Sequence, residues 1–168
     1  VTAKNQQLSA DYLIAQRSAS DVKSKRRSQV EGIEDYAVLG IRDAHSGVGI
    51  CQPRSSRTKD TCSGDFKTFV GPSIQKKSPH VVVKSDAAPE ITGAVYDLGW
   101  HSEPSLANKW PHNTEHERWG GSVKSVCRVN MLQSGLPKKA VQWCMMYSAI
   151  ALAADQPCPI HPLSLIHI

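Results

Sequence analysis

Three acidic residues stand where an expected strand, an expected strand end and an expected helix could bring carboxylates together. Asp11 lies inside the first expected strand, and Asp86 lies just past the apolar run of residues 81–83. Glu117 lies one turn into an expected helix. A carboxylate in or beside a buried strand is costly unless it is paired or bound to a metal ion. Three converging carboxylates would form an oxygen-lined site suited to Mg²⁺ or Mn²⁺.

The same carboxylates also have ordinary structural explanations. Asp86 could be a hydrogen-bonded turn residue, and Glu117 could stabilise a helix N-terminus through the helix macrodipole. Spacing alone leaves both explanations open.

The helix expected over residues 114–134 carries cations on the same face as Glu117. At 100° per residue, Lys124 and Arg128 lie within about 20° of Glu117. The stripe expected to face the core lies opposite and comprises Trp119, Val123, Val126 and Asn130. A carboxylate that continues into a row of cations matches a phosphodiester substrate. The alternative is pairing at i,i+4 and i,i+7 on a solvated face.

A second group of cations lies in a polar stretch and comprises Lys23, Lys25, Arg26 and Arg27. Such a run is by default a solvated loop, and it can also contact phosphate.

Composition narrows the class of protein. The chain has 168 residues, 40% of them apolar and 21% charged, with a net charge of +5, which is typical of one globular domain. No apolar run approaches the roughly 20 residues that cross a bilayer, so we expect no membrane span. The five cysteines form no C-x-x-C pair, which favours a reduced, intracellular protein without a cysteine-based zinc site. His112 and His116 have helical ligand spacing but no partner pair, so a zinc site is not expected.

The elements that must position these side chains follow from hydrophobic periodicity. Strands are predicted at residues 7–14, 36–41, 48–52 and 80–84, the middle two forming a hairpin around residues 45–47. Helices are predicted at residues 58–70, 89–98, 114–134 and 138–154, with a loop over 104–113. A hairpin that leads into alternating strands and helices predicts a single α/β domain with a mixed sheet and helices on both faces.

Several stretches, taken in order, resemble the catalytic core of retroviral and retrotransposon integrases, of the type found in copia-like retroelement polyproteins. Residues 10–14 (Ala-Asp-Tyr-Leu-Ile) resemble the first-acid strand, and residues 42–47 (Arg-Asp-Ala-His-Ser-Gly) the D-x-x-S-G hairpin. Residues 83–91 (Val-Lys-Ser-Asp-Ala-Ala-Pro-Glu-Ile) resemble the second-acid motif. Residues 98–101, Ser105 and residues 111–118 resemble the stretch that leads to the catalytic Glu-Arg. The resemblance extends over residues 8–153.

The resemblance implies an RNase H-like fold whose sheet starts with three antiparallel strands and continues with parallel ones. It implies that Asp11, Asp86 and Glu117 are the catalytic and metal-binding triad. The family catalyses DNA 3′-end processing and strand transfer, in which two Mg²⁺ or Mn²⁺ ions roughly 3.5–4 Å apart activate the nucleophile and stabilise the leaving oxygen. Asp43 would then be a structural hairpin residue, and Asp43 as the first acid is the alternative.

The resemblance also implies partners and a location. The expected partner is DNA, contacted through Arg118, Lys124, Arg128 and the cations of residues 23–27. We expect a homo-oligomer, to which the aromatic and methionine residues of the last helix could contribute, and no membrane. The expected location is the host-cell nucleus, as part of a retroelement polyprotein.

Two positions depart from the family pattern. Ala87 stands where Asn or Gly usually follows the second Asp, and Thr114 stands where Gly usually follows Asn. Both leave open a second hypothesis, a catalytically decayed relative that only binds nucleic acid. A third hypothesis is an interaction domain with coincidental motifs, in which the three acids lie far apart.

The chain starts at Val1, so we expect a fragment: an integrase core over residues 1–157, truncated at both ends. Residues 163–168 (Leu-Ser-Leu-Ile-His-Ile) resemble the translation of a transposase adapter used in sequencing libraries. They are therefore excluded from the fold prediction.

Overall fold

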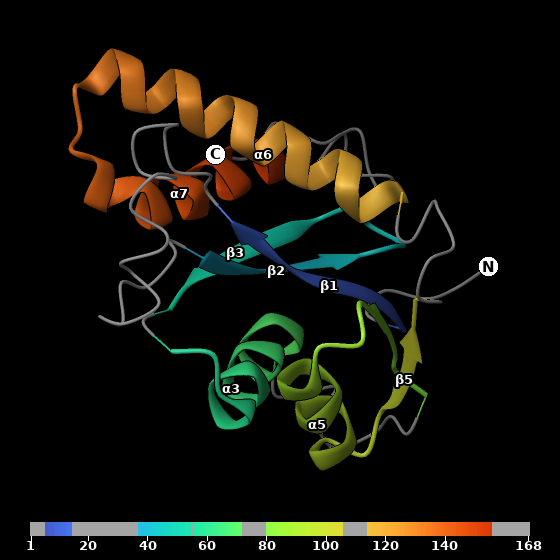
Figure 1. Cartoon of the computed structure of the whole chain (residues 1–168). Coiled ribbons are helices and arrows are strands. Elements are labelled where there is room, and N and C mark those ends of the chain that lie inside the picture. Colours follow the sequence, from blue (N-terminus) through green and yellow to red (C-terminus); the bar gives the residue numbers. More distant parts are fainter. Residues whose placement is uncertain (1–5, 15–36, 55, 72–79, 106–113, 156–168) are drawn as a thin grey trace.

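A computed structural model describes residues 6–14, 37–54, 56–71, 80–105 and 114–155 of the chain (Figure 1). Strands and helices alternate along most of it. In chain order the elements are β1 (Gln7–Ile14), β2 (Ala37–Asp43), β3 (Gly49–Pro53), α3 (Lys59–Val70), β4 (Val82–Ser85), α5 (Pro89–Asp97), β5 (His101–Pro104), α6 (Thr114–Ser134), the 3₁₀ helix η1 (Lys138–Ala140) and α7 (Val141–Ala154).

The strand that carries Asp11 is the centre of the sheet, whose strand order is β3-β2-β1-β4-β5. β2 pairs antiparallel with both β1 and β3, whereas β4 pairs parallel with β1 and β5. The parallel neighbours β4 and β5 are joined through α5, because parallel strands need a crossover connection. This arrangement confirms the predicted RNase H-like mixed sheet, antiparallel at its start and parallel after it.

Helices cover both faces of the sheet, with α3 and α5 on one face and α6 and α7 on the other (Figure 1). Two hydrophobic cores result. Leu8 and Ala10 of β1 belong to the core under α3 and α5, and Leu13 belongs to the core under α6 and α7. Because side chains alternate along a strand, Asp11 lies on the α6 face of β1.

The start of α3 follows local rules that the sequence makes visible. Thr58 is its N-cap, and Thr58 and Thr61 form a reciprocal capping box. Gly71 ends the helix with φ of 75°, a conformation that favours glycine. The predicted helix over residues 58–70 is therefore confirmed to within one residue.

Strand β5 is the element that the sequence pattern does not predict. It is four residues long and reads His-Ser-Glu-Pro, and among the described strands it pairs with β4 alone, at the edge of the sheet. Such a short polar edge strand has no apolar alternation to reveal it. The last predicted helix is also divided, because residues 138–140 form a 3₁₀ turn before α7 begins.

Some predictions fall outside the described residues. These are the basic stretch with Lys23, Lys25, Arg26 and Arg27, most of the 104–113 loop with His112, and residues 163–168. Within the part of the chain that the structure describes, no helix combines the length and apolarity needed to cross a bilayer.

Candidate active site

Asp11 sits near the middle of the central strand, opposite Gly40 of β2. Its side chain is half-buried on the face covered by α6. The backbone N–H of Tyr12 donates a hydrogen bond of 2.6 Å to its Oδ1 atom. The carboxylate is therefore oriented by its own strand.

Burial and neighbouring negative charge raise the pKa of Asp11 from 3.8 to about 6. Loss of solvation is the largest cause, followed by the negative charge of Asp86, and Glu117 adds to the rise. The Tyr12 N–H and the ammonium of Lys124 act in the opposite direction. Asp86, Glu117 and Lys124 thus all lie within electrostatic range of Asp11.

The position of Asp86 follows from the parallel pairing of β1 with β4. Ala10 is paired with Ser85, which is the last residue of β4. Asp86 directly follows the end of this strand and therefore lies next to Asp11. The Asp86 side chain is exposed. Neighbouring parallel strands end at the same edge of a sheet, which is where open α/β sheets place their sites.

Glu117 is brought to the same region by α6, which starts at Thr114 and crosses the sheet next to β1 (Figure 1). Its side chain is exposed in the first turn of the helix. Lys124 lies two turns further on and is half-buried. Asp86, Glu117 and Lys124 therefore all contribute to the electrostatic environment of Asp11.

The donor set has the chemistry of a site for a hard divalent cation, since all three side chains are carboxylates. Their spacing is looser than that of ligands around one ion. Within the described ranges, no three His, Cys, Asp or Glu side chains are close enough together to hold a metal ion.

Asp43, the alternative first acid, has a different environment. Its Oδ2 atom accepts hydrogen bonds from the backbone N–H of Ser46, at 2.9 Å, and from the Ser46 hydroxyl, at 2.6 Å. It pairs across the sheet with Leu8, so strand alternation places it on the face opposite Asp11. Its geometry is that of a residue that fastens the β2–β3 turn.

The α6 side chains that are expected to contact DNA differ in their solvent exposure. Arg118 and Arg128 are exposed on α6, and Lys124 is half-buried beside the carboxylates. The buried face of α6 is rotated toward Glu117 relative to the prediction. It comprises His116, Trp119, Gly120, Val123 and Cys127, while Val126 and Asn130 are only half-buried.

Sequence reasoning did not assign His116 a place in this site. The residue is 1% exposed, and its Nδ1 atom lies 2.9 Å from the hydroxyl oxygen of Ser9 on β1. Burial is the main cause, and the nearby charge of Arg42 the second, of a His116 pKa lowered from 6.5 to about 4. The signal was present in the sequence, because residues 116, 120, 123 and 127 follow helical i,i+3 and i,i+4 spacing.

The start of α6 is also held from β2 at the exposed rim. The guanidinium of Arg42 donates a 3.0 Å hydrogen bond to the carboxylate of Glu115. Arg42 and Ser9 are paired residues on adjacent strands. Two neighbouring strands therefore contact the first turn of the helix that carries Glu117.

Solved structures with the same architecture cover most of the chain. The HTLV-2 integrase catalytic core domain in complex with magnesium (trimeric form) superposes with a TM-score of 0.55 at 13% identity, over 86% of this chain and 84% of that one. The catalytic core domain of BIV integrase gives a TM-score of 0.59 at 11% identity, over 91% and 86%. The chain has the fold of a retroviral integrase catalytic core.

A third match extends the comparison to an assembled complex. The simian T-cell lymphotropic virus intasome, in complex with a PP2A regulatory subunit, matches with a TM-score of 0.58 at 12% identity, over 86% of this chain and 48% of that one. No protein-family model and no curated protein sequence matches the chain. The structural matches confirm the fold implied by the sequence motifs, and at such low identity the likeness is one of fold alone.

Proposed function

We propose that this chain is the catalytic core of a retroelement integrase, which processes DNA 3′ ends and joins them to target DNA with the help of Mg²⁺ or Mn²⁺. The observation that carries the proposal is the environment of Asp11. A carboxylate on the central strand has a raised pKa because it is buried and because Asp86 and Glu117 lie nearby. Acidic groups crowded in this way favour the binding of a cation.

In this proposal Asp11, Asp86 and Glu117 hold the divalent ions. Such ions supply activation of the attacking oxygen and stabilisation of the leaving oxygen of a phosphodiester. The protein's own contribution is positioning, from two adjacent strands and one helix, and charge balance from Lys124. Two matched structures, both of the HTLV-2 integrase catalytic core domain, are described as complexes with magnesium, which supports the choice of ion.

DNA is the proposed substrate and partner. Arg118, Lys124 and Arg128 lie on the helix that carries Glu117, where they can neutralise phosphates next to the reacting bond. Lys23, Lys25, Arg26 and Arg27 remain proposed phosphate contacts.

The direct test compares Mn²⁺ binding by calorimetry and cleavage of DNA ends for the wild type and Asp86→Asn. We expect the substitution to abolish both, because it removes one of three anionic ligands. Asp97→Asn is the matched control, since Asp97 is an exposed aspartate on α5 that pairs with Lys59 at 2.8 Å. Unchanged Mn²⁺ binding and cleavage in Asp86→Asn would refute the proposal.

The departures from the family pattern at Ala87 and Thr114 favour one alternative, a catalytically decayed relative that only binds nucleic acid. That protein would bind DNA with a strong salt dependence but would show neither Mn²⁺ binding nor cleavage. The same calorimetric experiment, run with and without DNA, separates the two.

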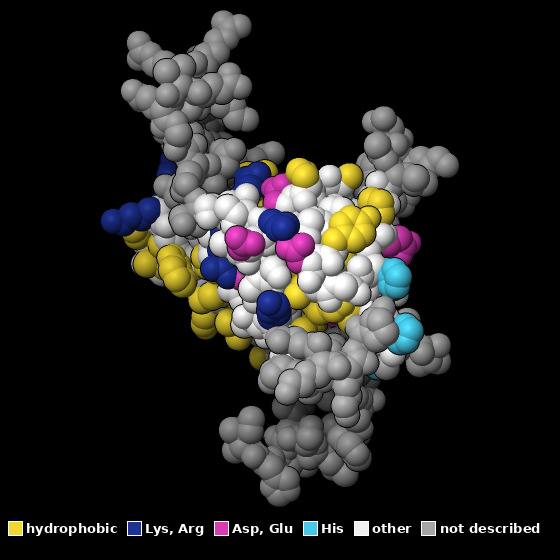
Figure 2. Space-filling model, turned by 90° about the horizontal axis from the view of Figure 1, so that it is seen from below, with side chains coloured by type: hydrophobic (Ala, Val, Ile, Leu, Met, Phe, Trp, Pro, Cys, Tyr) yellow, Lys and Arg dark blue, Asp and Glu magenta, His cyan; other side chains and the backbone are white. Residues whose placement is uncertain are grey.

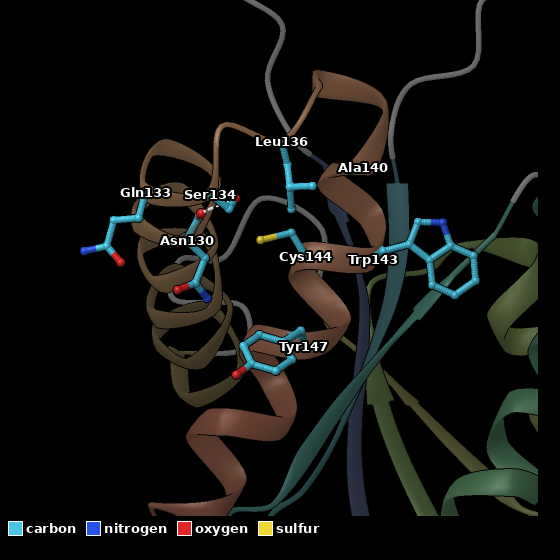
Figure 3. A pocket seen from close by; sticks show the side chains of 8 residues that line it. All are labelled: Asn130, Gln133, Ser134, Leu136, Ala140, Trp143, Cys144 and Tyr147. Atoms are coloured by element: carbon cyan, nitrogen blue, oxygen red, sulfur yellow. Dashed lines mark hydrogen bonds between the residues drawn. The ribbon is translucent and has the colours of Figure 1, made fainter.

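We also propose that the chain forms a homo-oligomer through α7. Three large side chains of this helix are exposed, Trp143, Tyr147 and Ile150, by 62%, 63% and 53%. Trp143 and Tyr147 line a pocket of about 550 Å³ between the end of α6 and the start of α7 (Figure 3). Structural neighbours are described in dimeric and trimeric forms, which supports a second copy as the occupant. Sedimentation of wild type and Trp143→Lys tests this, with a shift to monomer expected.

The proposed location is the nucleus of the host cell, where the target DNA is, and the proposed origin is a retroelement polyprotein. Microscopy of a fluorescent fusion of this chain tests the location.

A further inference from the structure

A buried polar contact joins the two elements that carry the first and third acids. Ser9 on β1 is 6% exposed and His116 on α6 is 1% exposed. The Ser9 hydroxyl oxygen and His116 Nδ1 lie 2.9 Å apart, and the tautomer decides which of them donates. The hydroxyl also lies 3.5 Å from the carbonyl oxygen of Arg42, as a weak donor to it.

The contact is adjacent in sequence to both carboxylates. Ser9 precedes Asp11 by two residues and therefore shares its face of β1. His116 directly precedes Glu117 in the first turn of α6. A single hydrogen bond therefore fixes the two backbones within two residues of the acidic groups that they present.

The imidazole is also confined on its other sides. A Cβ atom at Gly40 would lie 3.2 Å from His116 Nε2 and 2.9 Å from a ring carbon of Trp119. The rings of His116 and Trp119 meet edge to face, with centroids 5.2 Å apart. Gly40 is paired with Asp11, so the ring occupies space left open beside the first acid. The side chain is thereby held in one orientation.

Stability alone does not explain a polar pair at this position. Replacement of both hydrogen-bonding partners by apolar side chains of similar shape can leave the stability of a protein unchanged or raise it. Stability alone therefore does not require a hydrogen-bonded pair here. His116 Nε2 is buried and has no hydrogen-bond partner among the described residues, which is a further cost. What the pair adds to the apolar packing of α6 is direction, because a hydrogen bond constrains distance and angle more narrowly than apolar contacts do.

We propose that Ser9 and His116 are positioning residues, which set the place of Glu117 relative to Asp11 and so determine the affinity of the site for its divalent ion. The inference rests on the proposed metal-dependent function. Neither residue contacts the ion in this proposal. Both act through the backbones of β1 and α6, which carry Asp11 and Glu117.

The test is the Mn²⁺ concentration that gives half-maximal cleavage of DNA ends, together with the Mn²⁺ dissociation constant from calorimetry, measured for Ser9→Ala. We expect both to rise roughly 10- to 100-fold. Ser148→Ala is the matched control, because Ser148 is fully buried on α7 and donates a 2.8 Å hydrogen bond to the carbonyl of Cys144. The control should lose comparable thermal stability with no change in Mn²⁺ dependence.

Two substitutions of His116 keep the inference testable if Ser9→Ala folds poorly. The amide of His116→Asn can still bond to Ser9, so we expect Mn²⁺ affinity within a few-fold of wild type. His116→Leu fills the space but cannot bond, so its affinity should fall as that of Ser9→Ala does.

Two outcomes separate this inference from the proposed function. If the wild type binds Mn²⁺ and cleaves DNA but Ser9→Ala and His116→Leu match Ser148→Ala in Mn²⁺ dependence, the positioning role is overturned and the function stands. If the wild type neither binds Mn²⁺ nor cleaves DNA, the proposed function is overturned and the positioning role with it.

Discussion

The negative charge that Asp11 needs in the proposed function lowers the stability of the folded state. Its pKa is raised from 3.8 to about 6, chiefly by burial and next by Asp86. A raised acid pKa means that the folded state disfavours the ionised form. The resulting penalty is absent below about pH 4, grows as the pH rises through 6, and is constant above that.

Replacement of Asp11 by Asn should therefore stabilise the metal-free protein in a pH-dependent way. The Asn oxygen can still accept the Tyr12 N–H bond, and the charge is gone. In EDTA we expect a gain of about 1–2 kcal/mol in unfolding free energy at pH 8, after allowance for solvent screening, and almost none at pH 4. Thermal unfolding at both pH values measures it. Added Mn²⁺ should reverse the order by stabilising only the wild type. An equal loss of stability at both pH values would contradict this account.

Asp43 provides the complementary prediction for a structural aspartate. Its Oδ2 atom accepts two hydrogen bonds from Ser46, which fasten the turn between β2 and β3. Asp43→Ala should lower the free energy of unfolding by about 1–3 kcal/mol, because the half-buried Ser46 donors lose their acceptor. Calorimetry should find Mn²⁺ binding unchanged. If instead Mn²⁺ binding disappeared while stability remained, Asp43 would be the first acid.

At the scale of elements, the sequence predicts most strands and helices but not which of them are neighbours. Residues 7–14 and 114–134 are predicted with the bounds that β1 and α6 have, because alternation and helical spacing are strong there. The parallel pairing of β1 with β4 brings Asp86 beside Asp11, and these strands are far apart in the chain. No local pattern encodes that pairing, so the motif resemblance was needed to connect the three acids.

The face of α6 illustrates a second limit of sequence reasoning. Gly120 is buried against β1, and a Cβ atom there would come within 2.7 Å of a methyl of Leu13. Hydrophobicity does not identify glycine as a contact residue, so the predicted core stripe missed this side of the helix. The rotation that results brings His116 into the interior and leaves Glu117 at the rim.

Close approach of α6 to the sheet should be measurable through two glycines. A Cβ atom at Gly49 would lie 2.5 Å from the ring of Trp119, whereas one at the exposed Gly121 would meet nothing within 4 Å. Gly49→Ala should destabilise the fold by about 1–3 kcal/mol through overpacking. Gly121→Ala should stabilise it by roughly 0.5–1 kcal/mol, because alanine favours helix. Chemical denaturation checks both, and a neutral Gly49→Ala would show that α6 does not pack tightly on β3.

At the scale of the whole molecule, the chain has a net charge of +5, and the face formed by α3 and α5 carries both signs of charge (Figure 2). Figure 2 shows that this face carries Lys or Arg and Asp or Glu side chains close to one another. The ion pair between Lys59 of α3 and Asp97 of α5 is an example, at 2.8 Å. A phosphate backbone would meet both signs of charge there. The opposite face carries Arg118, Lys124 and Arg128 on α6, and we propose it as the face that contacts DNA.

The proposed role of α6 predicts which cations cause the salt dependence of DNA binding. Replacement of Lys124 and Arg128 by Gln should reduce the slope of log affinity against log salt concentration by about 2 for a DNA end, since each lost phosphate contact removes about 0.9. Filter binding or fluorescence anisotropy over a salt series measures the slope. Lys138→Gln with Lys139→Gln makes the same change in net charge on η1, beyond the far end of α6, and should leave the slope unchanged. Equal effects from both pairs would mean that DNA responds to the overall charge of the protein, and α6 would then lose its proposed role as the phosphate-binding face.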